Sequence, residues 1–98
     1  MRLAELFIAV KEEGLDKDKL ESYYQQLTYL SAQMELSIAD LEKEAAVFLE
    51  ASLEETDAAK NRKWRATASG QNLITLKRQV KATDKMRASV KTRLYQIY

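Results

Sequence analysis

Cationic side chains, with one tryptophan among them, crowd the second half of the chain and could bind a phosphate backbone or an acidic protein. Three of the lysines recur every fourth residue and therefore share one side of a helix. A tryptophan among cations could stack on a base or hold an arginine over its ring. The alternative is that the tryptophan closes the end of a core, and that the lysines face the glutamates of a preceding helix or water. The candidate contacts are Lys60, Arg62, Lys63, Trp64, Arg65, Lys77, Arg78, Lys81, Lys85 and Lys91.

The residues that most catalysis needs are missing. There is no cysteine and no histidine, which removes thiolate nucleophiles, zinc-thiolate sites and the commonest general base. Two isolated glycines cannot build a phosphate-binding loop. The glutamates of residues 42–55 have the pattern of the wet face of a helix rather than of a paired acid and base. We therefore expect no enzyme, no metal site and no cofactor.

The charge is sharply divided along the chain. Residues 1–57 hold five Lys/Arg against fourteen Asp/Glu, a net −9, whereas residues 58–98 hold eleven Lys/Arg against Asp84 alone, a net +10. An acidic helix and a basic helix that lie antiparallel and neutralise each other would explain this polarity. A basic surface for nucleic acid or for an acidic protein is the second explanation.

Apolar residues at three- and four-residue spacing predict three helices, over residues 2–13, 16–65 and 71–97. The chain has no proline, and Gly14 and Gly70 are the expected interruptions. The expected fold is a single all-α domain, an elongated antiparallel helical hairpin resembling a three-helix coiled coil, with a long central helix. The preferred break after the central helix is Ala66 to Gly70. A capping-box pattern at residues 52–55, or a cap at Thr56 and Asp57, would instead start a new helix earlier.

A hairpin that turns near residues 65 and 66 sets the pairing of the second and third helices. It places Leu41 against Val90 and Phe48 against Thr83. The same register brings Glu44 to Arg87, the one charged member of the apolar seam, and predicts a structural ion pair.

A second apolar face is expected on the central helix, at Tyr29, Leu36, Val47 and Leu49. Such a face usually finds an intermolecular partner, so we expect a homo-oligomer that also engages another protein. No segment reaches the length of a membrane span and the first ten residues lack a signal-peptide pattern, so the expected location is the cytoplasm.

The layout of residues 60–98, with the basic turn Arg62-Lys63-Trp64-Arg65 and the basic helix at 76–82, resembles that of small coiled-coil proteins encoded by bacteriophages. The resemblance implies a small accessory protein that binds nucleic acid, a replication or recombination protein, or an anti-defence protein in the host cytoplasm. Two classes of function are therefore expected: a helical adaptor or inhibitor, and a nucleic-acid-binding accessory protein that uses the tip at 60–65 and the last helix.

Overall fold

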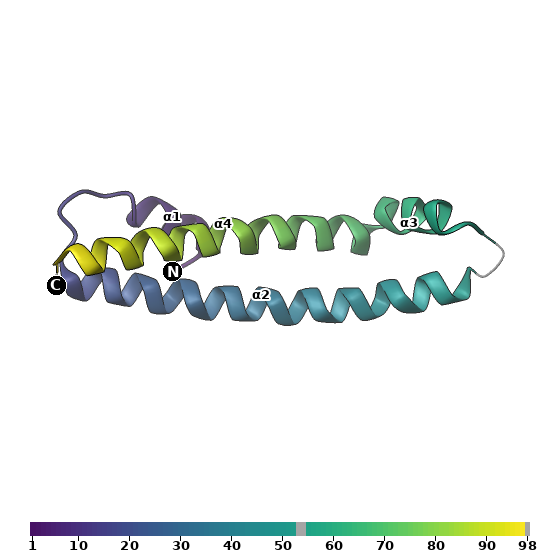
Figure 1. Ribbon diagram of the computed structural model, residues 1–98, viewed down its shortest axis with the longest axis horizontal. Helices are drawn as coiled ribbons and strands as arrows, with labels where there is room; N and C mark the ends of the chain where they lie inside the picture. The colour runs from purple at the N-terminus through teal and green to yellow at the C-terminus, as the bar shows by residue number, and fades with distance from the viewer. Residues whose placement is uncertain (53–54, 98) are drawn as a thin grey trace. The chain divides into compact units, whose positions relative to one another are not determined.

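The computed structural model describes residues 1–52 and 55–97, and in these residues all regular structure is helical (Figure 1). The helices are α1 (Leu3–Ala9), α2 (Lys17–Ala51), α3 (Asp57–Ala66) and α4 (Ala68–Ile97). The all-α prediction, with a long helix in the middle of the chain, is therefore confirmed. The helices form two compact units, residues 1–33 with 80–97 (unit 1) and residues 34–79 (unit 2).

Unit 1 joins α1, the first part of α2 and the last part of α4 around one apolar core (Figure 1). The α2 and α4 segments run antiparallel in this unit. Its core has the periodicity read from the sequence. The buried members are Leu6, Val10, Leu20, Leu27 and Val90.

The turn between α1 and α2 contains Gly14 in the left-handed conformation, with a φ of +75°, but Gly14 does not cap α1, whose C-cap is Val10. The Asp16 carboxylate then accepts a hydrogen bond of 2.8 Å from the backbone N–H of Lys19 at the start of α2. The first helix ends at Ala9, earlier than the predicted residue 13. The carbonyl oxygens of Val10 and Glu12 accept hydrogen bonds from Arg93 of α4 and not from a further turn of α1.

Unit 2 contains the end of α2, then α3, then the start of α4 (Figure 1). The prediction of one helix through residues 16–65 is wrong, because α2 ends at Ala51 and α3 begins at Asp57. Thr56 is extended, and its hydroxyl accepts a hydrogen bond of 3.2 Å from the N–H of Ala59. The alternative start at Thr56 and Asp57 is thus confirmed, and the capping box at 52–55 includes residues 53 and 54, which lie outside the described residues.

The break predicted at residues 66–70 is shorter in the structure. Thr67 alone separates α3 from α4, and α4 begins at Ala68 instead of residue 71. The Thr67 hydroxyl donates to the carbonyl of Trp64 at 2.6 Å and accepts from the N–H of Gly70 at 3.0 Å. Gly70 packs directly on the end of α3, because a Cβ at this position would lie 2.0 Å from the carbonyl oxygen of Trp64. The chain bends here and does not reverse: within unit 2, α3 and α4 run in the same direction along α2 (Figure 1).

The chain therefore reverses between the end of α2 at Ala51 and the start of α3 at Asp57, and the predicted pairing of the long helices is wrong. Leu41 belongs to the core of unit 2, with Trp64 and Leu73, whereas Val90 belongs to the core of unit 1. Glu42 pairs with Lys77, which is 12 positions before Ser89, the residue placed opposite Glu42 by the predicted turn. Thr83 and Phe48 likewise lie in different units.

Candidate functional site

The predicted basic tip is the helix α3, but its tryptophan is not part of the surface. Trp64 is 8% exposed, and its ring centroid lies 5.7 Å from that of Phe48 on α2. The ring closes the end of the core of unit 2, so the interpretation that Trp64 stacks on a base is wrong. The hypothesis that it belongs to the core is confirmed.

The cations of unit 2 are divided between ion pairs and open surface. Lys63 forms an ion pair with Glu55, and Lys77 with Glu42 at 3.4 Å. Both partners of the second pair are more than half exposed, so it contributes little to stability. Lys60 is half-buried, and Arg62, Arg65 and Arg78 are exposed. Neutralisation of basic residues by acidic ones therefore occurs in unit 2, at particular pairs.

A shallow groove lies beside Trp64, between α2, α3 and α4 of unit 2. Its volume is about 410 Å³. Ala45, Leu49, Leu73 and Ile74 contribute apolar side chains to it, and Lys77 and Glu42 are among its polar residues. An apolar groove of this kind can hold a side chain of a partner protein, but it brings together no pair of groups for acid and base catalysis.

The cations of unit 1 differ from those of unit 2 because they face no acidic helix. Lys81, Lys85 and Lys91 are exposed on α4 and form no ion pair among the described residues. The hydrogen bond from Ser31 to Asp84 and the packing of Leu27 with Val90 place this part of α4 beside residues 22–34 of α2, which include no charged side chain. The predicted neutralisation by an acidic helix does not take place here.

Arg87 pairs with Asp84, and the predicted pair with Glu44 is wrong. Its Nη1 lies 3.2 Å from an Asp84 carboxylate oxygen, and that same oxygen accepts the hydrogen bond from Ser31. The guanidinium lies over the ring of Tyr24, 5.6 Å from its centroid. A hydrogen bond with the Tyr24 side chain raises the pKa of Arg87, partial burial lowers it, and the first effect is larger. A raised pKa keeps Arg87 charged, and its contribution to stability would be lost only at strongly alkaline pH.

Two tyrosines accompany these cations, and neither is among the predicted contacts. Lys91 lies over the ring of Tyr95, 5.9 Å from its centroid, in the same way that Arg87 lies over Tyr24. Tyr24, Asp84, Arg87 and Lys91 border one hollow of about 340 Å³. A second hollow of about 190 Å³ lies between Tyr24, Lys91 and Tyr95. We call the surface formed by Tyr24, Lys81, Lys85, Arg87, Lys91 and Tyr95 the lysine-tyrosine face.

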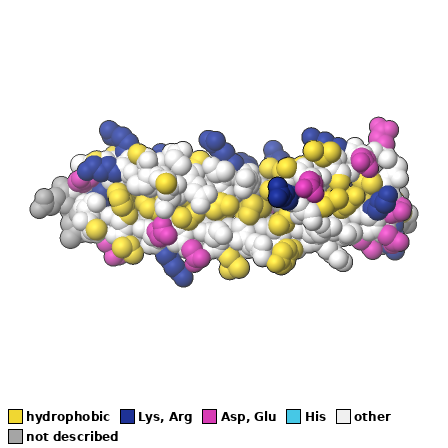
Figure 2. All heavy atoms as spheres, turned by 180° about the vertical axis from the view of Figure 1, so that it is seen from behind, with side chains coloured by type: hydrophobic (Ala, Val, Ile, Leu, Met, Phe, Trp, Pro, Cys, Tyr) yellow, Lys and Arg dark blue, Asp and Glu magenta, His cyan; other side chains and the backbone are white. Residues whose placement is uncertain are grey.

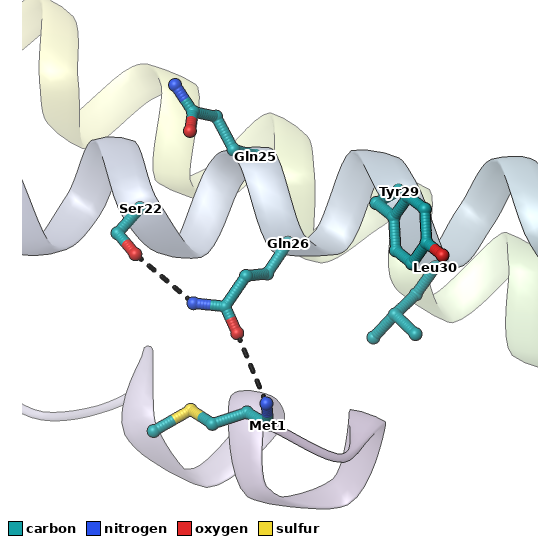
Figure 3. A pocket seen from close by; sticks show the side chains of 6 residues that line it. All are labelled: Met1, Ser22, Gln25, Gln26, Tyr29 and Leu30. Carbon is teal, nitrogen blue, oxygen red and sulfur yellow. Dashed lines mark hydrogen bonds between the residues drawn. The ribbon is translucent and has the colours of Figure 1, made fainter.

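Another hollow of unit 1 lies between α2 and the start of the chain, and three of the residues that line it are linked by hydrogen bonds (Figure 3). The Met1 amino group donates to the Gln26 side-chain oxygen at 3.5 Å, and the Gln26 amide donates to the Ser22 hydroxyl at 3.1 Å. Gln25, Tyr29 and Leu30 complete the lining. These groups include no nucleophile with a neighbouring base, so the hollow offers no catalytic chemistry.

Apolar side chains reach the surface between charged ones, as Figure 2 shows for one face of the molecule. On α2, Tyr29, Leu36 and Val47 are 62%, 69% and 67% exposed, so these members of the predicted second apolar face are indeed open. Leu49 is half-buried and lines the groove beside Trp64. The exposed set is the feature of α2 that intramolecular packing does not explain.

Across residues 1–52 and 55–97, no group of three or more acidic side chains is placed to hold a metal ion. None of the helices in that part of the chain is long and apolar enough to cross a membrane. No protein-family model, curated protein or solved structure matches the chain.

Proposed function

We propose that this protein is a non-enzymatic helical interaction protein of the cytoplasm, which self-associates and engages a partner protein through charged helical faces. The supporting observation is the exposure of Leu36 and Val47 on α2 in unit 2. They are eleven residues apart, or about three turns, and therefore lie on the same side of the helix. Ala39 and Ala46 beside this line are exposed and small, so a second helix can come close.

The charges along the same line favour a second copy of this chain as the occupant. In an antiparallel pair related by a two-fold axis, the register that places Leu36 against Val47 of the other copy also places Asp40 against Lys43 of the other copy. Asp40 and Lys43 are both exposed, and neither forms an ion pair within the described chain. One register thus satisfies the apolar residues and the charges twice over, once on each side of the axis.

The dimer should be weak, because few side chains take part. Burying a leucine or valine contributes roughly 1.5–3 kcal/mol, and association itself costs several kcal/mol. We therefore expect dimers at tens of micromolar protein and above. Leu36→Glu should leave a monomer, whereas Ser37→Glu, which adds the same charge on a neighbouring exposed position, should leave the dimer intact. Sedimentation velocity over a range of concentrations measures both.

A charge exchange tests the register itself. Asp40→Lys should weaken the dimer, because the new ammonium group would meet Lys43 of the other copy, and the double variant Asp40→Lys/Lys43→Asp should restore it. A wild-type protein that stays monomeric at hundreds of micromolar would contradict self-association. A dimer that loses nothing in Leu36→Glu would place the contact on another surface.

A further inference from the structure

The last part of α4 carries an excess of positive charge in unit 1. Between residues 80 and 91 this helix holds Lys81, Lys85, Arg87 and Lys91 and a single acidic residue, Asp84. The carboxylate of Asp84 is already bound by Ser31 and Arg87. The segment of α2 beside this stretch has no charged residue from 22 to 34. The remaining positive charge is therefore available to a ligand that is anionic.

Helical spacing arranges these cations and the exposed tyrosine in two rows on α4. Arg87, Lys91 and Tyr95 follow each other at intervals of four residues, which is a rise of about 6 Å for each step. Lys81 and Lys85 form a second row at the same interval, about 120° around the helix from Arg87 and Lys91. A flexible chain of anions that crosses α4 obliquely can contact cations of both rows.

The aromatic rings distinguish the candidate anions. Tyr95 is 69% exposed, and its ring lies beside Lys91 at the edge of the hollow that Tyr24 also borders. An acidic peptide needs only the cations, whereas single-stranded nucleic acid combines phosphates with flat bases that stack on aromatic side chains. In a duplex the faces of the bases are covered by their neighbours, so an exposed tyrosine at this position favours a single strand.

We propose that the lysine-tyrosine face of unit 1 binds single-stranded nucleic acid, with Lys81, Lys85 and Lys91 at the phosphates and Tyr95 stacked on a base beside Tyr24. This activity goes beyond self-association, since it uses residues of unit 1 and none of the residues of the α2 dimer contact. The site differs from the predicted tip at 60–65, because the tryptophan of that tip is buried.

The test is fluorescence anisotropy with a labelled oligothymidine of about 12 nucleotides, a length within the usual range of single-strand binding sites. Affinity should fall steeply from about 50 to about 200 mM salt, with a log-log slope of about −0.7 for each phosphate contacted. Lys91→Glu should weaken binding roughly tenfold or more, and Tyr95→Ala by roughly 5- to 100-fold, as loss of a stacked base does.

Matched variants distinguish binding at the lysine-tyrosine face from nonspecific attraction of the oligonucleotide to the charge of the whole protein. Lys19→Glu makes the same charge change at an exposed position on α2, and Tyr29→Ala removes a tyrosine that is similarly exposed, 62% against 69% for Tyr95. Both should bind the oligonucleotide like the wild type. Circular dichroism and the midpoint of urea unfolding show that each variant is folded.

Several outcomes would overturn the proposal. One is no binding at the lowest salt, and another is an equal loss in Lys19→Glu and Lys91→Glu. An unchanged affinity of the Tyr95→Ala variant would contradict the stacking of a base on Tyr95. Tighter binding of a duplex or of a polyglutamate competitor would identify a different partner. The dimer variant Leu36→Glu, tested in parallel, shows whether a loss of binding comes from this face or from loss of self-association.

Discussion

The hydroxyl of Ser31 on α2 donates a 3.0 Å hydrogen bond to the carboxylate of Asp84 on α4, 53 residues further along the chain. Ser31 is 2% exposed, so its hydroxyl has no access to water. A buried hydroxyl without an acceptor is costly, and this pairing therefore favours one alignment of the two helices in unit 1 over others that would keep the apolar seam. The same carboxylate fixes Arg87 next to Tyr24.

Loss of the Asp84 carboxylate should destabilise the protein more than loss of the serine. Asp84→Ala leaves a buried hydroxyl unsatisfied, which costs about 1–3 kcal/mol, whereas Ser31→Ala leaves a half-exposed carboxylate that water can reach, at about 0.5–1.5 kcal/mol. Urea unfolding of both variants and of the double variant measures the coupling between them. Glu35→Ala, which removes an exposed carboxylate of α2, should change stability by less than about 0.5 kcal/mol. An Asp84→Ala variant as stable as Glu35→Ala would show that the hydrogen bond contributes nothing.

Gly70→Ala should destabilise the protein even though Gly70 lies in a helix. In an ordinary helix the change to alanine stabilises by up to about 1 kcal/mol. Here the added Cβ would lie 2.0 Å from the Trp64 carbonyl oxygen and 2.8 Å from its carbon, so the junction of α3 and α4 must shift, at a cost of about 1–3 kcal/mol or more. Thermal unfolding gives the sign of the effect.

Gly14 is the control for this prediction, because glycine is favoured there by the backbone conformation and not by a lack of space. Nothing lies within 4 Å of a Cβ built there, and only the positive φ disfavours other residues. Asparagine tolerates this conformation, so Gly14→Asn should be more stable than Gly14→Ala. At position 70 asparagine should be no better than alanine, and a rescue by asparagine there would contradict the steric explanation.

Thr56→Ala distinguishes two separate helices from a continuous one by the sign of its effect. The hydroxyl of Thr56 caps α3 through the N–H of Ala59, and removal of such a cap costs about 1 kcal/mol. In the interior of a continuous helix the same substitution would stabilise, because alanine has the higher helix propensity. Thr56→Ser should retain the cap and most of the stability. The midpoint of urea unfolding is the measurement, with the exposed Ser37→Ala as control.

The sequence was sufficient for the helical class and for most of the core, because burial follows the periodicity of the apolar residues. Leu20, Leu27 and Leu41 of the predicted seam are buried, as are Leu73 and Val90. The end of α2 at Ala51 and the start of α3 at Asp57 are hard to predict, because no glycine or proline marks them and a threonine cap is a weak signal when it stands alone. The predicted pairing of α2 with α4 is wrong for the same reason, because it was counted from the position of the turn.

The error in register was hard to detect from the pattern. Lys77 and Asp84 meet α2 residues 12 and 16 positions before the points that the predicted turn would set opposite them, an average of two heptads. A shift by whole heptads returns apolar residues to apolar partners. The pattern of charged residues is more sensitive to the register than the apolar pattern, because it does not repeat every seven residues. The shift moves Lys85 and Lys91 from the acidic part of α2 to its uncharged part, and it brings Tyr24 to Arg87. No spacing within one helix could have revealed that neighbour.

Trp64→Ala should be among the most destabilising single changes in unit 2, since Trp64 is buried against Phe48 and Leu73 belongs to the same core. Truncation of a buried tryptophan costs about 3–5 kcal/mol, and Trp64→Phe, which keeps a ring next to Phe48, should cost much less. Arg62→Ala on the exposed side of α3 should change stability by less than about 0.5 kcal/mol. Urea unfolding measures all three. Because Trp64 is the single tryptophan, its emission reports on this core, and it should be insensitive to added oligonucleotide. Quenching on addition would place the ring at an interface and contradict its assignment to the core.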